Sequence, residues 1–311
     1  MHVLLNPHCD HGRGGKKWAR IASDWQGRFG DCRITETHST EGLVEILRGL
    51  VREGEQTIVA AGGDGTVHWI LNALLSLPRS GPERAVSFGA VGLGSSNDFH
   101  KPFRPENAIR GIPVRLDAGQ SRLQDLIEVR WEDETGGKHA RFCVNNAGLG
   151  ITAEGNRRFS AKGPVIGTLQ HFSVEAAIAA SAVWTIFSYR NRSFRIQVDD
   201  RPPFQAMLTN LGILKNPYFG GGLHYDLPIA PDDGRLCICL SESMSRFQAV
   251  RTLVRLYQGR FKGLPGTASW TASRVSVVAG SRCFALEMDG EVVQARKADF
   301  KVVPKAVRCC A

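Results

Sequence analysis

Residues 57–77 read TIVAAGGDGTVHWILNALLSL, and this stretch decides the fold class. The apolar segment from Thr57 to Ala61 is typical of a buried strand, and the segment from Val67 to Leu77 is typical of a helix. Between them stands Gly62-Gly63-Asp64-Gly65-Thr66. Glycines let the backbone approach a polyphosphate, and a helix amino terminus offers free N–H groups. A Gly-Gly pair by itself would indicate only a turn, but this context favours a phosphate-binding loop.

The same alternation continues on both sides of this unit. Strands are expected at His2 to Leu5, Arg33 to Thr35 and Val86 to Val91, and helices are expected from Gly15 and over Glu41 to Arg52. Strands that alternate with helices predict a parallel sheet with crossover helices. Functional loops should then lie at the carboxyl ends of the strands.

The second part of the chain has a different pattern. From about Asp117, strand-like runs dominate, at Leu126 to Trp131, Ala140 to Asn145, Phe194 to Asp199, Ala206 to Leu211 and Leu236 to Leu240. The Gly136-Gly137 pair between the first two runs indicates a hairpin. We therefore expect an α/β domain over residues 1–116 and a β-rich, β-sandwich-like domain over residues 117–296.

Two further glycine loops follow expected strands. Gly92 to Phe99 follows the strand that ends at Val91, and Asn6-Pro7 follows the first strand, with Gly12-Arg13-Gly14-Gly15-Lys16 shortly after it. Each loop considered alone could be a polar surface turn. If their strands share one parallel sheet, the three loops meet at one edge and can form a nucleotide site.

The composition limits the class of protein. The 311 residues carry a net charge of +9, which favours polyanions such as nucleic acid, an anionic membrane or a phosphate-bearing substrate. No nucleic-acid recognition motif accompanies the basic residues, so we expect no nucleic-acid partner. The amino terminus lacks the features of an export signal, and the eight cysteines lack metal-site spacing, which predicts a cytoplasmic protein with reduced thiols.

The order of the motifs resembles the diacylglycerol kinase-like lipid kinases, a family that includes bacterial diacylglycerol kinases and relatives of sphingosine kinases. The pieces that carry the resemblance span almost the whole chain: Asn6-Pro7, Gly62 to Thr66, Gly94 to Phe99, Asn146 to Gly150, Phe219 to Gly222, Asp233-Gly234 and Asp289-Gly290-Glu291. The resemblance implies an amino-terminal domain like those of phosphofructokinase and NAD kinase. It also implies that the carboxyl-terminal segment, from about residue 297 to 311, returns to that domain.

The resemblance assigns roles to particular residues. It implies ATP and Mg²⁺ as cofactors, with Glu291 as the general base that accepts the proton of a lipid hydroxyl. Asp64, Asp98 and Asp117 would organise the catalytic magnesium, and Asp233 would hold a second, structural magnesium with carbonyl oxygens near Ala230 and Arg235. The residues implied to bind ATP are Asn6, Thr40, Gly62, Gly63, Asp64, Gly65, Thr66, Ser95 and Asn97. From spacing alone, Asp289-Gly290-Glu291 would be only a hairpin turn.

The chain departs from the family pattern in the first loop. Cys9-Asp10 stands where the family usually has Ser-Gly or Ala-Gly, and a carboxylate near phosphates would repel them. Asp10 could instead point away, with Gly12 or Gly14 giving the close approach to phosphate. Ser95 replaces a more usual threonine and keeps the hydroxyl group, so we expect little consequence from that change.

Two apolar segments are candidates for contact with a lipid or a membrane. Phe247, Val250, Leu253, Val254 and Tyr257 recur at helical spacing beside Arg251 and Arg255, which predicts a basic amphipathic helix. The helix could rest on an anionic membrane at the inner surface, or could pack on the β-rich domain. The stretch from Phe172 to Phe187 could line an acyl-chain entrance or form a core helix. A homodimer is an open alternative.

The sequence therefore favours an ATP-dependent lipid kinase, a phosphotransferase with an alcohol acceptor. Two alternatives stay open: a kinase for a soluble substrate, of the NAD kinase or phosphofructokinase type, and a non-catalytic lipid-binding module on the same scaffold. Retention of Asp64, Asp98 and Glu291 argues against the module. The sequence does not name the lipid.

Overall fold

The computed structural model describes residues 1–78, 86–160, 174–280 and 282–311. It divides the chain into two compact units, one formed by Met1–Gln124 with Lys305–Ala311, and one formed by Asp125–Pro304. The expected α/β and β-rich parts are both present. Each unit is described by itself below.

The first unit is built on a parallel sheet. Its order is β2 (Arg33–Glu36), β1 (His2–Leu5), β3 (Thr57–Gly62) and β4 (Ser87–Gly92). Beyond β4 lie the antiparallel strand β6 (Ile112–Arg115) and the end of β19 (Lys297–Cys309), which pairs in parallel with β4 through Arg308 and Cys309. β1, β3 and β4 are almost wholly buried, which explains their continuous apolar sequences.

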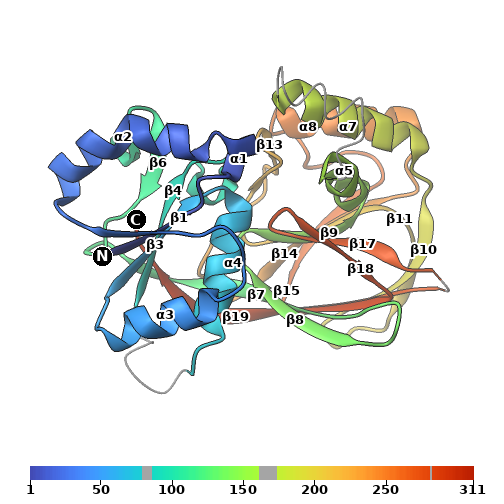
Figure 1. Cartoon of the computed structure of the whole chain (residues 1–311). Helices are drawn as coiled ribbons and strands as arrows, with labels where there is room; N and C mark the ends of the chain where they lie inside the picture. Colours follow the sequence, from blue (N-terminus) through green and yellow to red (C-terminus); the bar gives the residue numbers. More distant parts are fainter. Residues whose placement is uncertain (79–85, 161–173, 281) are drawn as a thin grey trace. The chain divides into compact units, whose positions relative to one another are not determined.

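Helices cover both faces of this sheet (Figure 1). Helix α2 (Gly14–Phe29) lies on one face, where Trp18, Ile21 and Trp25 pack on odd-numbered residues of β1 and β3. Helix α3 (Leu43–Arg52) lies on the opposite face and contacts α4 (Asp64–Leu75), which packs on β3 and β4. The remaining short elements in the described part of the unit are α1 (Cys9–Gly12), η2 (Asp98–His100), η3 (Pro105–Asn107) and β5 (Ala108–Ile109).

The second unit consists mainly of antiparallel strands. One run of paired strands is β18 (Glu291–Ala295), β17 (Phe284–Met288), β9 (Asn146–Gly150), β11 (Phe204–Leu214), β14 (Leu236–Glu242) and β15 (Thr267–Ala272). A second run joins β11 to β10 (Arg192–Val198), β16 (Arg274–Ala279) and β19. The expected hairpin at Gly136-Gly137 connects β7 (Arg122–Glu132) to β8 (Lys138–Cys143).

Apolar side chains from both runs form one core, which includes Leu149, Leu211, Leu286, Ile196 and Phe300. Cys237 and Cys239 point to the other face of β14, into a smaller cluster with Tyr225, Leu256 and Phe261. Strand alternation therefore accounts for the Cys-Ile-Cys spacing.

Among its described residues, three helices and one small ribbon complete the second unit. The helices are α5 (Ile151–Ser160), α7 (Val174–Ser188) and α8 (Arg246–Tyr257), and the ribbon pairs β12 (Tyr218–Phe219) with β13 (Leu223–His224). A capping box between Ser245 and Gln248 begins α8 where the spacing predicted a helix. The predicted apolar stretch at 172–187 starts at residues 172 and 173, which lie outside the described residues; α7 accounts for the rest.

Candidate active site

Three loops of the first unit leave the sheet at one edge. Leu5 is level with Ala61 in the pairing of β1 with β3, and Gly62 is level with Gly92 in the pairing of β3 with β4. The chain therefore turns into its loops at the same height after all three strands. The sequence predicted this common edge from the parallel pattern alone.

The two principal glycine loops are in direct backbone contact. A Cβ atom on Gly94 would lie 2.5 Å from the Cα atom of Gly63, and a Cβ atom on Gly62 would lie 2.3 Å from Oγ1 of Thr66. The amide of Leu93 also donates to the carbonyl oxygen of Gly62 at 2.8 Å. Glycine is needed at position 94 because the two backbones approach too closely for a side chain, and at position 62 because the Thr66 side chain fills the space.

Helix α4 begins earlier than the sequence predicted. Its first residue is Asp64, and Gly63 is its N-cap, so Asp64, Gly65 and Thr66 form the first turn. Backbone N–H groups in a first turn have no partner within the helix and are suited to anions. Asn6 supports this turn, because its Nδ2 donates to Oγ1 of Thr66 at 3.0 Å.

Asn97 holds the second glycine loop together. It adopts a left-handed conformation, with φ of 49°, and its side chain is buried. Its Oδ1 accepts from the amide of Gly94 at 3.0 Å, and its Nδ2 donates to the carbonyl oxygens of Gly92 and Gly94, each at 3.1 Å. The geometry therefore gives Asn97 a positioning role in the loop.

Asp64 joins the two loops through hydrogen bonds. Its carboxylate accepts from the amide of Asp98 at 3.1 Å and from the amide of Phe99 at 3.0 Å. The carboxylate of Asp98 in turn forms an ion pair with Lys101 at 2.7 Å. The two amide bonds orient the Asp64 carboxylate beside the two glycine loops.

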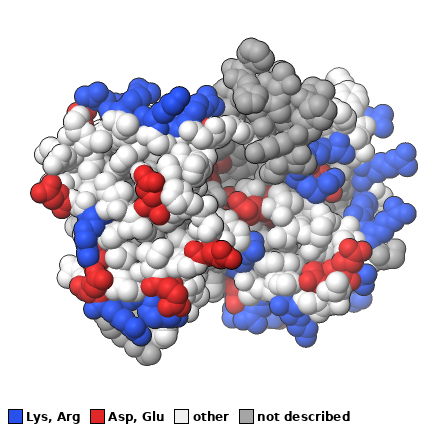
Figure 2. Space-filling model, viewed as in Figure 1, with Lys and Arg blue, Asp and Glu red and all other residues white. Residues whose placement is uncertain are grey.

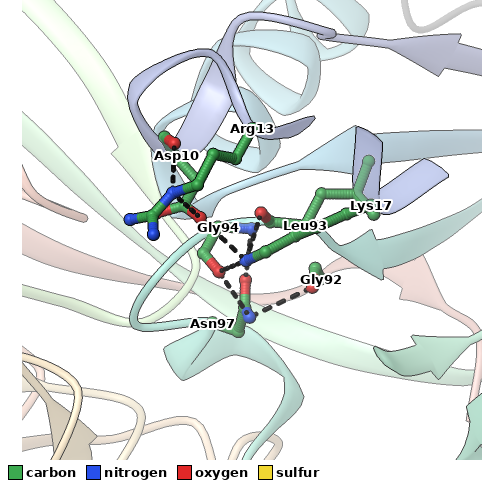
Figure 3. Close-up of polar contacts among 7 residues, drawn as sticks. All are labelled: Asp10, Arg13, Lys17, Gly92, Leu93, Gly94 and Asn97. Atoms are coloured by element: carbon green, nitrogen blue, oxygen red, sulfur yellow. Dashed lines mark hydrogen bonds and ion pairs between the residues drawn. The ribbon is translucent and has the colours of Figure 1, made fainter. Parts of the chain in front are cut away.

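Lys17 is a cation at this site that the sequence analysis did not single out (Figure 3). Its ammonium group donates to the carbonyl oxygens of Leu93 at 3.0 Å and Gly94 at 2.9 Å, and it lies 3.0 Å from the carboxylate of Asp10. Arg13 also pairs with Asp10, at 3.2 Å. The unusual Asp10 is thus neutralised by two cations next to the second glycine loop. The run of basic residues after Gly12 was the available signal.

The first loop is shaped by Gly14. A Cβ atom there would lie 2.5 Å from Sγ of Cys9 and 2.8 Å from the carbonyl oxygen of Asn6, whereas Gly12 faces open space. Asp10 and His11 both have positive φ, of 51° and 56°. Of the two glycines considered for the close approach, Gly14 is therefore the one against which the loop packs.

Three other residues assigned by the resemblance, Thr40, Ser95 and Asp117, are exposed. Thr40 and Ser95 lie in loops. Asp117 accepts from the amide of Gln120 at 3.1 Å, as in a turn. Among the residues that the structure describes, no group of three or more His, Cys, Asp or Glu side chains is arranged to hold a metal ion. A magnesium ion that arrives on ATP brings phosphate oxygens with it, so Asp64 fits that ion without a preformed cage.

Glu291 lies in the second unit, at the start of β18. Asp289 and Gly290 form the two-residue turn before it, with φ of 49° and 94°, so the hairpin reading of this motif is correct as a description of the backbone. The buried carboxylate of Asp289 accepts from three amides, those of Val144 at 3.0 Å, Asn145 at 2.9 Å and Asn146 at 3.1 Å. These bonds fix the turn and hence the backbone position of Glu291.

The charge of Glu291 acts on Arg141 of β8. Burial lowers the pKa of Arg141, and the negative charge of Glu291 opposes that shift. The Asn145-Asn146 segment that holds Asp289 also binds Asn216, through a side-chain bond of 2.9 Å to Asn145. Two of the resembling motifs of this unit, at Asn146 and at Asp289, are therefore tied into one hydrogen-bonded group.

Asp233 also lies in the second unit. Its carboxylate is 2.7 Å from the ammonium group of Lys215, which also donates to the carbonyl oxygen of Arg235 at 2.9 Å. A lysine cation therefore stands among the oxygen atoms to which the resemblance assigned a structural magnesium. These residues do not fit a metal ion at that position.

Comparison with known families identifies the two halves. Residues 1–129 match the diacylglycerol kinase catalytic domain. Residues 161–311 match the YegS C-terminal NAD kinase β-sandwich-like domain. The chain belongs to the diacylglycerol kinase-like lipid kinases. The recognition made from the ordered motifs is thereby confirmed, as is the fold class.

Similar proteins agree with this membership. The kinase is 25% identical to a protein of Yersinia enterocolitica (serotype O:8 / biotype 1B) named "probable lipid kinase YegS-like", over 82% of this chain and 78% of the relative. It is 23% identical to a Yersinia pestis (strain Pestoides F) protein of the same name, over 81% and 78%.

Solved structures show the same fold at low identity. A crystal structure of a diacylglycerol kinase from Bacillus anthracis str. Sterne superposes with a TM-score of 0.63 at 14% identity, covering 99% of this kinase and 95% of that chain. Yeast NADH kinase bound to NADH gives a TM-score of 0.50 at 10% identity, covering 100% and 82%. The second likeness fits the expected relation to NAD kinases at the level of fold.

The surface of this kinase carries separate basic and apolar features. Figure 2 shows Lys and Arg side chains gathered over α2, where Lys16 and Arg20 are exposed. In α8 the buried residues are Ala249, Thr252 and Leu256, so Phe247 remains 80% exposed. Within the described ranges, every helix is too short or too polar to cross a bilayer.

Proposed function

We propose that this kinase transfers the γ-phosphate of ATP to a hydroxyl group of a membrane lipid, with diacylglycerol as the first candidate. The observation that carries the proposal is the backbone contact between the two glycine loops at Gly63 and Gly94. This contact places the first turn of α4 beside the Lys17 ammonium group, and both features favour bound phosphate.

Asp64 would hold the magnesium ion of Mg–ATP. Magnesium would supply neutralisation of the phosphate charge that develops during phosphoryl transfer. The two amides that donate to Asp64 keep its carboxylate in one orientation, which supports a role in positioning. Asn97 and Lys17 would keep the second loop in the conformation that receives the phosphates.

Glu291 would act as the general base. A carboxylate in hydrogen-bond reach of the lipid hydroxyl can accept its proton as the oxygen attacks the phosphorus atom. The support in this chain is the rigid turn before Glu291, because Asp289 accepts three backbone hydrogen bonds. Residues that are held by such a network are suited to catalysis, since misplacement of the base is costly.

The membrane would be contacted by the face formed by α7 and α8. These helices contact each other, and the large apolar side chains exposed among the side chains that the structure describes on them are Val183, Trp184, Phe187, Phe247, Val254 and Tyr257. Arg246 and Arg251 are exposed on the same helix as Phe247. Aromatic side chains beside arginines favour the interface of an anionic membrane. We call these residues the α7–α8 face.

The test is transfer of labelled γ-phosphate from Mg–ATP to a panel of lipids in mixed micelles. The proposal expects label in one lipid class, and a loss of about 100- to 10,000-fold in Glu291→Gln, the range for removal of a general base. ATP binding, measured separately, should be retained in Glu291→Gln and reduced in Asp64→Ala. Label that enters NAD but no lipid would replace the proposal with a soluble-substrate kinase.

Asp289→Ala is the matched test of the hairpin. It should reduce transfer while Glu291 is still present, because three amides lose their acceptor and the turn is released. Transfer at the native rate from a folded Asp289→Ala protein would show that the turn does not position the base.

A further inference from the structure

The lysine that stands beside Asp233 is almost completely buried. The side chain of Lys215 is 1% exposed and that of Asp125 is 0% exposed, whereas Asp233 is 36% exposed. Lys215 directly follows β11, and Asp125 belongs to β7, 90 positions away in the sequence. Burying a charge is costly unless the charge is paired and hydrogen-bonded, so this arrangement has a specific cause.

The ammonium group of Lys215 has a complete set of acceptors. It lies 2.9 Å from Oδ2 of Asp125, 2.7 Å from Oδ1 of Asp233 and 2.9 Å from the carbonyl oxygen of Arg235. A lysine ammonium group has three N–H donors. Three donors meet three oxygen atoms, and each distance is that of an ordinary charge-assisted hydrogen bond.

The same oxygen atoms hold their own loop together. Oδ2 of Asp125 accepts from the amide of Gly234 at 2.7 Å, and the amide of Asp125 donates to the carbonyl oxygen of Pro231 at 2.8 Å. Oδ1 of Asp233 accepts from the amide of Arg235 at 3.0 Å. Lys215 is therefore the central cation of a loop, residues 231–235, that is closed onto β7 and β11.

Two carboxylates and a carbonyl oxygen are a typical donor set for a hard divalent cation. Magnesium would need these oxygen atoms at about 2.0–2.1 Å, and it would be repelled by an ammonium group among them. We propose that Lys215 is a built-in cation that replaces a structural divalent metal ion in this kinase. The loop is then held by the chain itself, independently of the metal concentration.

Thermal unfolding without nucleotide tests the proposal, because it does not depend on kinase activity. The Tm of the native chain should be the same in EDTA and in millimolar Mg²⁺ or Mn²⁺. Lys215→Met should lower the Tm in EDTA by about 10 °C, since the Asp125 carboxylate is left buried without its cation. In that variant, Mg²⁺ or Mn²⁺ should raise the Tm by roughly 5–10 °C when the ion is at about 100 times its Kd.

The matched control is Lys215→Met with Asp125→Asn, which removes both charges and should not respond to metal. A folded Lys215→Met protein that responds to neither EDTA nor metal would overturn the proposal. If that variant does not fold, Mn²⁺ titration of the nucleotide-free native chain decides the matter. The proposal expects that the native chain has no Mn²⁺ site that is lost in Asp233→Asn. A site that is lost in this variant would show that the loop binds a divalent ion despite Lys215, and would overturn the proposal.

Discussion

The carboxylate of Asp10 lies 3.0 Å from the ammonium group of Lys17, which also donates to the carbonyl oxygen of Gly94. This ion pair gives Asp10 a role different from the one that the sequence suggested. The sequence suggested that a carboxylate in the first loop would repel phosphate, but the structure pairs it with Lys17 and Arg13. Asp10 thus holds cations at the second glycine loop, where phosphate is expected.

Lys17→Met should weaken ATP binding by about 10-fold or more, because a charge-assisted contact is lost and Asp10 keeps only Arg13 as its cationic partner. Isothermal titration with Mg–ATP measures the effect. Lys16→Met is the control, since Lys16 is exposed on the same helix. Lys17→Met combined with Asp10→Asn should recover part of the affinity, and purely additive losses would argue against coupling of the two charges.

Gly94→Ala should separate the two glycine loops. The new Cβ atom would lie 2.5 Å from the Cα atom of Gly63, so backbone must shift, and we expect a loss of about 1–3 kcal/mol of stability with greatly reduced ATP binding. Gly27→Ala is the control, because Gly27 lies within α2 with no atom within 4 Å of the new Cβ. That change should stabilise by about 0.5–1 kcal/mol. Equal ATP affinity in Gly94→Ala and the native chain would contradict the loop contact.

The α7–α8 face should govern binding to lipid vesicles. Phe247→Ser should lower the partition to anionic vesicles by about 10-fold, from the loss of one buried aromatic side chain, and Arg251→Gln by about 5-fold. Co-sedimentation measures both. Phe103→Ser is the control, because Phe103 is an exposed phenylalanine, at 54%, that lies in the first unit. An equal loss of vesicle binding from all three changes, or no loss from any of them, would show that the α7–α8 face does not bind the membrane.

His100 should make stability depend on pH. Burial lowers its pKa to about 3, from an ordinary value of 6.5, so the unfolded chain binds a proton that the native state does not. The free energy of unfolding should therefore fall as the pH drops below 6.5, by up to about 1.4 kcal/mol per pH unit from this group. Urea unfolding over this range measures the slope. His100→Gln should reduce it, whereas His38→Gln, at an exposed position, should not.

The sequence by itself determined the fold and the order of the phosphate loops. Thr57–Gly62 and Ser87–Gly92 are continuous apolar strands with glycines at their ends, and this pattern is local enough to be read from neighbouring residues. Parallel pairing then places the loops at one edge, because strands in register end at the same height. The helix of 246–257 was also predicted from a local pattern, the helical spacing of its apolar residues, but that pattern did not show that Phe247 is 80% exposed.

Only the tertiary structure decided which charges meet. Lys17, which pairs with Asp10, reaches the carbonyl oxygen of Gly94 across 77 positions, and Lys215 reaches Asp125 across 90 positions. Hydrophobic periodicity and secondary-structure propensity are set by residues within one or two turns or strands. An ion pair between distant residues depends on the final positions of the elements that carry them. For that reason the sequence placed a carboxylate in the phosphate site and a metal beside Asp233, while the folded chain supplies a lysine at each of them.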